Sequence, residues 1–200
     1  MGSLRCVRAI GVAVALAVLG GPALTGCAAA PGEDAVVAAA GYEDVAKLPY
    51  NLVDVLFSRE MILHYRQGVT MARLAPGRGR DPFVLSLAAD VLRDDPARVG
   101  PLAASLTAWE FSVPDADKPP LHQMEGMLSP AQLLLLKKRS GAEFDRLWLT
   151  AFARHTDYGV RLAEKAGREG KDGRTVELAR AAAAVQRARL AGIVEHLKKP

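Results

Sequence analysis

Sulfur and imidazole side chains are the groups in this 200-residue sequence whose types and spacing could do chemistry. Four methionines follow Met1, all between residues 61 and 127, and histidines lie among them and again at residue 155. Thioether sulfur and imidazole nitrogen suit Cu(I), whereas hard cations prefer oxygen ligands. The candidate ligands of a soft metal ion are therefore Met61, His64, Met71, His122, Met124, Met127 and His155.

Three of these candidates share one face of a predicted helix. At about 100° per residue, Met61, His64 and Met71 fall on one arc, and arginines occupy the opposite arc. The histidine therefore points into the core. Methionines at helical spacing also serve as ordinary core residues, and buried histidines can be held by hydrogen bonds alone. The sequence leaves both interpretations open: a soft-metal site, or a purely structural core.

No motif of a common enzyme class accompanies these residues. The sequence contains no HExxH pair, no glycine-rich phosphate loop and no nucleophile elbow. Glu60 and His64 are four residues apart, which is not the Glu-x-x-His spacing of di-iron bundles. We therefore expect a protein that is not an enzyme. Copper is a hypothesis for its cofactor.

A repeat at a constant offset of 91 residues predicts which elements position these side chains. The segment 54–72 is echoed by 145–163, and each copy carries one histidine followed one turn later by a glycine, Gly68 or Gly159. These glycines predict close helix contacts. Matches at the same offset continue towards the C-terminus, so each copy predicts a hairpin of two helices, and two such hairpins make an all-α four-helix bundle. Whether the first and third main helices run parallel or antiparallel stays open.

Local signals give approximate bounds for the helices. The predicted main helices cover about 51–74, 81–109, 142–166 and 175–198. Pro96 and Pro101 are expected to kink or split the second of them. Ser129 and Gln132 resemble a capping box, with Pro130 in the first turn, that starts a short helix through Leu133 to Lys138 within the long connector between the hairpins.

At these residues the chain resembles a bacterial ferritin-like family, domain of unknown function 305 (DUF305). The resemblance rests on Asp-x-x-Phe, Met-x-x-His and Met-Ala in the first copy, on the Gly-x-x-Phe-Asp-Arg segment from Gly141, and on the Met124-Glu-Gly-Met127 connector. It covers about residues 51–197. The resemblance implies a ferritin-like four-helix bundle, export or lipid anchoring and, as in some members, copper bound through methionine and histidine.

The chain departs from the family pattern at several ligand positions. The family usually has paired histidines in each copy, and the second of each pair is Tyr65 or Thr156 here. Phe152 and Leu162 stand where the first copy keeps Met61 and Met71. In the partner helices the usual glutamine is Asp95 or Gln186, and the usual glutamate is Arg98 or Arg189. The alternative function is therefore a structural or interaction domain of the cell envelope that kept the fold and lost the metal.

The N-terminus predicts an export signal. Arg5 and Arg8 precede an apolar run, residues 9–19, that is too short for a permanent transmembrane helix. Leu24-Thr-Gly-Cys27 resembles a lipobox, which predicts a lipid on Cys27 that holds the protein on the extracytoplasmic face of the cell membrane. The alternative is an ordinary secretory signal cleaved near residues 28–30, with Cys27 discarded.

The sequence thus predicts three regions: a lipoprotein signal peptide (1–26), a flexible tether (27–47) with a short helix as its alternative, and a ferritin-like domain (48–200) with repeats at about 51–109 and 142–198. Without Arg5 and Arg8, 24 basic residues stand against 22 acidic ones. This small excess predicts no nucleic-acid partner. The expected partners are the membrane, through the lipid, and a metal ion, and the oligomeric state stays open.

Overall fold

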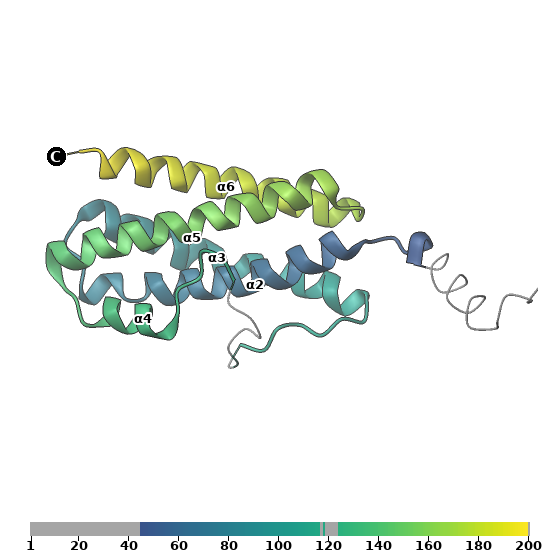
Figure 1. The fold of residues 1–200 in the computed structure, drawn as a ribbon, viewed down its shortest axis with the longest axis horizontal. Helices are drawn as coiled ribbons and strands as arrows, with labels where there is room; N and C mark the ends of the chain where they lie inside the picture. Colours follow the sequence, from purple (N-terminus) through teal and green to yellow (C-terminus); the bar gives the residue numbers. More distant parts are fainter. Residues whose placement is uncertain (1–44, 117, 119–123, 200) are drawn as a thin grey trace, which may run out of the picture. The chain divides into compact units, whose positions relative to one another are not determined.

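The computed structural model describes residues 45–116, 118 and 124–199, and these residues form helices and no strand. The elements are α2 (Leu52–Ala72), η1 (Ala75–Gly77), α3 (Pro82–Ala108), α4 (Pro130–Lys137), α5 (Gly141–Glu169) and α6 (Gly173–Leu197) (Figure 1). The prediction of an all-α fold is confirmed. The predicted signal peptide, Cys27 and His122 lie outside the described residues, as does the tether up to residue 44, whereas residues 45–47 are helical.

The two hairpins meet through α2 and α5, which run antiparallel. Asn51, just before α2, donates its side-chain N–H to the carbonyl of Glu169, the last residue of α5, at 2.7 Å. Trp148, near the start of α5, donates Nε1–H to the carbonyl of Met71 at the end of α2, at 3.0 Å. α3 packs on α2 and α6 packs on α5, so the four main helices form the predicted bundle (Figure 1).

Side-chain caps start several of these helices. Asn51 and Asp54 form a reciprocal capping box at α2, and Ser129 and Gln132 form the predicted one at α4. Each box satisfies two backbone N–H groups that have no partner inside the helix. α4 begins at Pro130, and its proline occupies the first turn as predicted, where no N–H is needed.

α3 is one unbroken helix, so of the two outcomes expected at its prolines, a kink or a split, the split does not occur. Pro96 and Pro101 both lie inside it, and each removes one helical hydrogen bond. The C-terminal part of α3 buries Leu102 and Leu106 in the core, to 2% and 0% exposure. This tertiary packing outweighs the local preference of proline for a helix end.

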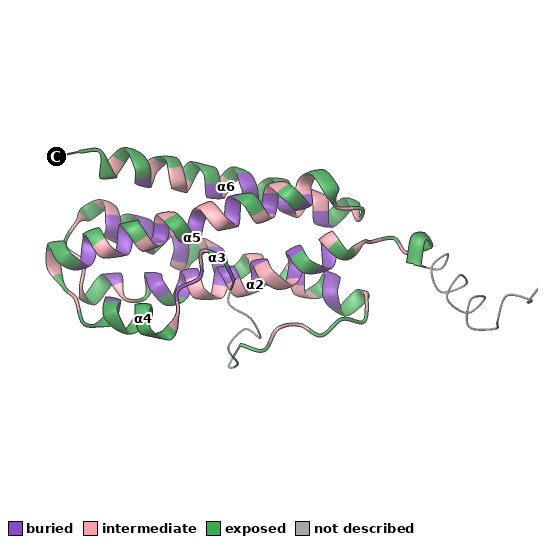
Figure 2. Ribbon diagram, viewed as in Figure 1, coloured by how far each residue is buried: buried purple, intermediate pink, exposed green. Residues whose placement is uncertain are grey.

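A polar layer separates two apolar clusters in the core. One cluster surrounds Trp148 and Met71, and the other surrounds Phe57 and Met61. Figure 2 shows the buried residues on the faces that the helices turn towards one another. His64 on α2 and Asp95 on α3 lie between apolar residues of the two clusters along the chain, and so do the equivalent positions of α5 and α6.

Candidate functional site

Every main helix contributes a polar side chain to this layer. The contributions are His64 from α2, Asp95 from α3, His155 and Thr156 from α5, and Gln186 and Arg189 from α6. The histidines, Asp95 and Gln186 are each 1–2% exposed. Buried polar groups of this kind need partners, because an unsatisfied one costs free energy.

The two histidines of the repeat stack on each other at the centre of the layer. Their ring centroids are 3.9 Å apart and their planes differ by 8°. The glycines of the repeat make room for them. A Cβ atom at Gly159 would lie 2.6 Å from Nε2 of His64, and one at Gly68 would lie 3.4 Å from Nε2 of His155. The predicted close helix contact is confirmed at Gly159, whereas a Cβ atom at Gly68 would lie at an ordinary contact distance.

The hydrogen bonds of the two rings differ, although the repeat relates them. The side-chain amide nitrogen of Gln186 lies 3.1 Å from Nε2 of His64. That nitrogen is a donor, so Nε2 of His64 accepts and its ring proton lies on Nδ1. Asp95 is the residue equivalent to Gln186, but Arg189 occupies its carboxylate, with contacts of 2.8 and 2.9 Å. His155 therefore lacks the partner that His64 has.

Three buried ring nitrogens have no hydrogen-bond partner in the part of the chain that the structure describes: Nδ1 of His64 and both nitrogens of His155. The backbone at Gly126 approaches His155 and opposes the lowering of its pKa, but its geometry is not that of a hydrogen bond. Burial lowers the pKa of His155 to about 4. Burial holds the pKa of His64 well below its usual range, and the neighbouring His155 lowers it further. Both rings are therefore neutral near pH 7, which is the form that binds metals.

The structure separates the two helical methionines. Met61 and Met71 are both fully buried, but they belong to different apolar clusters. Ten residues of α-helix span about 15 Å, so the two sulfur atoms do not face one point. Met61 lies three residues before His64, whereas Met71 lies at the level of Trp148. Of the two thioethers, Met61 is the one placed to join the histidine pair.

The connector that carries the other two methionines packs against the bundle. Met124 and Met127 are 3% and 7% exposed. Gln67 on α2 exchanges two hydrogen bonds with the backbone of Leu128, at 2.9 and 2.7 Å. Gly126, at φ 71°, lies so close to Tyr158 that a Cβ atom there would be 2.5 Å from that side chain. Both sulfur atoms are thus held in the interior, whereas His122 is outside the described residues.

The geometry of the pair limits how it could hold an ion. The lone pairs of an imidazole lie in its ring plane, and the two planes here are nearly parallel. One ion cannot lie in both planes unless a ring turns. Across the described residues, no group of three or more His, Cys, Asp or Glu side chains is arranged to hold a metal ion. A metal site among the described residues would therefore need ligands of another kind as well, and thioether sulfur is one that the interior supplies.

Two buried aspartates of the repeat join the hairpins, and the sequence reasoning assigned them no role. The carboxylate of Asp54 on α2 accepts the backbone N–H groups of Lys171 and Asp172, at 2.9 and 3.0 Å, in the turn before α6. The carboxylate of Asp145 on α5 likewise accepts the N–H groups of residues 80 and 81, at 3.1 and 3.0 Å, in the turn before α3. The offset of 91 residues relates the two aspartates and could have revealed this reciprocal contact.

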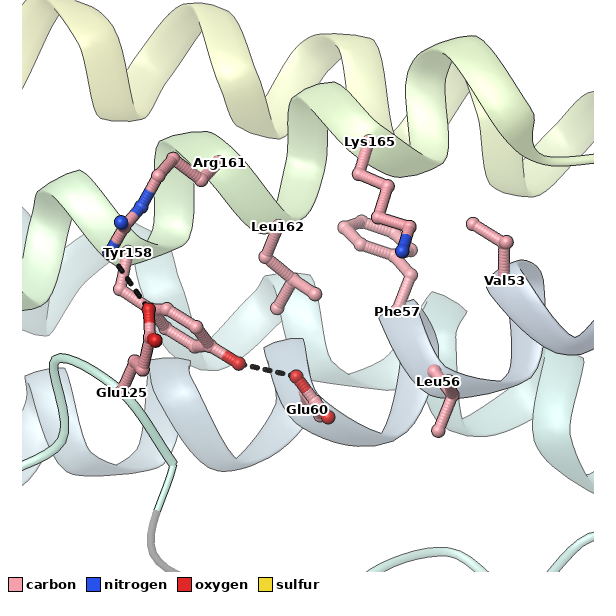
Figure 3. A pocket seen from close by; sticks show the side chains of 9 residues that line it. All are labelled: Val53, Leu56, Phe57, Glu60, Glu125, Tyr158, Arg161, Leu162 and Lys165. Carbon is pink, nitrogen blue, oxygen red and sulfur yellow. Dashed lines mark hydrogen bonds and ion pairs between the residues drawn. The ribbon is translucent and has the colours of Figure 1, made fainter.

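A surface cavity of about 300 Å³ opens between α2 and α5, beside the connector. Figure 3 shows that its polar groups face one another: the Tyr158 hydroxyl donates to Glu60, and Arg161 pairs with Glu125 at 3.3 Å. Burial, with a further contribution from Glu60, raises the pKa of Tyr158, so its hydroxyl stays a donor. The cavity walls are otherwise mainly apolar and include neither histidine of the stacked pair.

Comparison with known families identifies the chain. The model of the family called domain of unknown function DUF305 matches residues 54–197, which include both copies of the repeat and the connector. The chain belongs to the DUF305 family. No protein of curated function matches the sequence of this DUF305 protein.

Solved structures share its fold. A DUF305 protein of Streptomyces coelicolor, described as secreted, is 24% identical, with a TM-score of 0.64, and the alignment covers 72% of this chain and 90% of that one. A DUF305 fragment of Deinococcus radiodurans is 23% identical, with a TM-score of 0.66 and coverage of 75% and 98%. CopM in its Cu(I)-bound form is 19% identical, with a TM-score of 0.57 and coverage of 71% and 93%. At these identities the similarity shows the fold alone.

Long apolar helices are missing from the described part of this DUF305 protein: none of its helices is both long enough and apolar enough to cross a membrane.

Proposed function

We propose that this DUF305 protein is a non-enzymatic binder of a soft metal ion, with copper as the first candidate, at the His64–His155 pair. The observation that carries the proposal is the set of three buried ring nitrogens without a hydrogen-bond partner among the described residues. Each unsatisfied buried group costs about 1–3 kcal/mol. A metal ion bound to the unprotonated ring nitrogen of His155 would offset part of that cost. Ligation by Nδ1 of His64 would require its proton to move to Nε2 and the Gln186 amide to turn its oxygen towards that nitrogen.

The chemistry of the neighbouring side chains agrees with a soft ion. Imidazole nitrogen and thioether sulfur suit Cu(I) and similar ions of low coordination number. Met61, three residues before His64, would supply the sulfur from the same face of α2. Met124 and Met127 are further thioethers held in the interior by the connector. CopM, which shares the fold, has been solved in Cu(I)-bound, Cu(II)-bound and silver-bound forms.

A structural or interaction domain without metal is the second candidate. The near-parallel stacking of the two rings favours it, because that geometry does not direct two lone pairs at one ion. The ion pair of Arg189 with Asp95 favours it as well. Arg189 places a positive charge in the polar layer, and this charge opposes the binding of a cation.

We further propose that the protein acts outside the cytoplasm, anchored by a lipid on Cys27. The support is the sequence pattern of residues 1–27, in which arginines, a short apolar run and a lipobox-like end follow one another. The protein of similar fold from Streptomyces coelicolor is described as secreted. The lipid would keep the metal-binding domain at the membrane surface.

An anaerobic titration tests whether the protein binds Cu(I). In it, the chain of residues 27–200 with Cys27→Ala competes with a chelator for Cu(I). We expect the wild-type site to withdraw Cu(I) from a weak chelator and Met61→Leu to bind less tightly. This exchange keeps the side-chain volume and costs less than about 1.5 kcal/mol of stability. Met71→Leu is the matched control, because it makes the same exchange about 15 Å further along the same helix.

Two results would reject the site and favour the interaction domain. The first is a wild-type chain that takes no Cu(I) from the chelator. The second is a Met61→Leu, His64→Ala double variant that binds as tightly as the wild type.

A further inference from the structure

The short helix α4 presents an apolar surface that the bundle does not use. Leu136 is 1% exposed and anchors α4 to the core, but the two preceding leucines, Leu134 and Leu135, are 52% and 41% exposed. Figure 2 shows α4 as a largely exposed helix at the edge of the bundle. Single exposed leucines are common on soluble proteins, whereas adjacent ones next to cations are typical of interfacial membrane contacts.

Basic residues outnumber acidic ones in the segments that form this end of the bundle. The segments 73–81 and 130–150 contain seven basic residues against three acidic ones: Arg73, Arg78, Arg80, Lys137, Lys138, Arg139 and Arg146 against Asp81, Glu143 and Asp145. Contacts bring the two segments together, because Arg78 donates Nε–H to the carbonyl of Lys137 at 3.0 Å and its own carbonyl accepts from Gly141 at 2.7 Å.

The three acidic groups are already engaged within the protein. Asp145 is buried and accepts backbone N–H groups. Glu143 pairs with Arg139 at 3.0 Å, and Asp81 contacts His196 at 2.6 Å. Four of the basic residues have no ion-pair partner within the described residues: Arg80, Lys137, Lys138 and Arg146. Their charges are therefore free to interact with an external partner.

A hollow next to Leu135 completes this surface. It has a volume of about 280 Å³ and lies between α4 and α5, with Arg139 and Arg146 among its lining residues. We call the exposed leucines, the four unpaired cations and this hollow the α4 surface. It combines apolar side chains, which can enter the outer part of a bilayer, with guanidinium and ammonium groups at the level where lipid phosphates lie.

We propose that the α4 surface docks on an anionic phospholipid bilayer. Charge complementarity carries the choice of occupant, because a second copy of this chain would bring cations against cations. The exposed leucines add the apolar insertion that a purely electrostatic partner would not need. This contact requires neither the metal nor the lipid on Cys27.

Vesicle flotation tests the proposal with residues 27–200 carrying Cys27→Ala, without added metal. We expect binding to phosphatidylglycerol vesicles, none to phosphatidylcholine vesicles, and release as the ionic strength rises. Lys137→Glu with Lys138→Glu should weaken binding by about tenfold or more, since each basic residue near an anionic surface contributes roughly a factor of five. Leu134→Ser with Leu135→Ser should weaken it by about tenfold or more through lost insertion.

Matched controls use the opposite end of the bundle. Leu52 and Leu56 are 68% and 44% exposed, so Leu52→Ser with Leu56→Ser removes the same groups elsewhere. Arg168→Glu with Arg174→Glu makes the same change in net charge. Both controls should bind as the wild type does, and circular dichroism should show an intact fold for every variant.

Three results would overturn the proposal. The wild type could fail to bind anionic vesicles, the controls could lose binding as much as the α4 variants, or light scattering could show that the serine variants split a dimer. Failure here leaves the copper titration unaffected, because no metal enters this assay.

Discussion

At Gly159 a single added methyl group would reach the ring of His64. The Cβ atom of Gly159→Ala would lie 2.6 Å from Nε2 of His64 and 3.3 Å from the amide carbon of Gln186. The stack on His155 limits how far the ring can move. We expect a net loss of about 1–3 kcal/mol in the free energy of unfolding, although alanine favours the helix by about 1 kcal/mol. Urea denaturation measures the difference.

Gly68→Ala is the control for this prediction. Its Cβ atom would lie 3.4 Å from Nε2 of His155, which is an ordinary contact distance. The gain in helix propensity should therefore prevail, and the variant should be as stable as the wild type or more stable by up to about 1 kcal/mol. Equal losses at both positions would contradict the close contact at Gly159.

The buried histidines also predict how stability depends on pH. Burial lowers the pKa of His155 to about 4, and that of His64 is lowered in the same way. Below pH of about 6.5 the unfolded chain binds protons that the folded rings refuse, so the free energy of unfolding falls as the pH falls. For His155 the loss begins near pH 6.5, continues down to about pH 4 and reaches about 3 kcal/mol there, at about 1.4 kcal/mol per pKa unit.

Urea denaturation measures this loss of stability. The wild type and His155→Gln are compared at several pH values between about 4 and 6.5. The variant should lose less stability over the same range, because it has one buried imidazole fewer. The raised pKa of Asp95, caused by burial, acts in the opposite direction and reduces the net slope. Parallel curves for the two proteins would show that His155 does not titrate as its burial implies.

The sequence predicted the direction of these side chains but not their partners. Helical periodicity predicts that His64 and His155 point inward, and both are buried. It does not predict that the rings meet, because that depends on the antiparallel crossing of α2 and α5. The 91-residue offset aligns Asp95 with Gln186, yet it does not show that Arg189 takes the carboxylate. Whether Arg189 or the His155 ring donates to the Asp95 carboxylate depends on how the helices bring these side chains together.

At the scale of elements, the two aspartates of the repeat make the hairpins depend on each other. The Asp54 carboxylate accepts backbone N–H groups from Asn51, Lys171 and Asp172. All three bonds go to Oδ2, whereas Oδ1 has no hydrogen-bond partner among the described residues. The amide oxygen of Asn can take the place of Oδ2, but it is neutral and a weaker acceptor. We expect Asp54→Asn to lower the free energy of unfolding by about 2–4 kcal/mol, because these hydrogen bonds involve a charged acceptor. Thermal or urea denaturation measures the loss.

Asp145→Asn should cost less, because its carboxylate accepts from two backbone N–H groups and not from three. Asp90→Asn is a surface control. The Asp90 side chain is 47% exposed and pairs with Arg93, so its loss should stay within about 0.5 kcal/mol. A loss at Asp54 as small as that at Asp90 would mean that the contact between the hairpins contributes little.

The bounds of the main helices were largely predictable from the sequence. The continuity of α3 through its two prolines was not, and this has a physical cause. The repeat predicted two helical hairpins and placed the main helices to within a few residues, because hydrophobic periodicity and caps are local signals. Pro96 and Pro101 are also local signals, and they do not end α3. Burial of Leu102 and Leu106 favours continuation of the helix past both prolines, and burial is not a local property.

For the whole molecule, the internal repeat relates the two hairpins to each other, but the basic residues are not distributed in the same way. The repeat relates the two hairpins around the histidine pair, whereas the leucines and lysines of the α4 surface lie in the connector, which the repeat does not include. The proposed metal site and the proposed membrane contact are therefore separable by substitution. Substitutions in the polar layer should leave vesicle binding unchanged, and substitutions in the α4 surface should leave Cu(I) binding unchanged.

The two proposed membrane contacts respond differently to salt, which separates them in cells. An acyl chain on Cys27 holds by apolar insertion, so the wild type should stay in the membrane fraction through a wash at about 0.5 M salt. Cys27→Ala should remain partly bound at low salt through the α4 surface and leave the membrane in that wash. Adding Lys137→Glu and Lys138→Glu should release it at low salt as well, whereas this lysine pair alone, with Cys27 intact, should stay bound. Fractionation and immunoblotting measure each case, and a Cys27→Ala protein that survives the salt wash would show that the lipid is not its anchor.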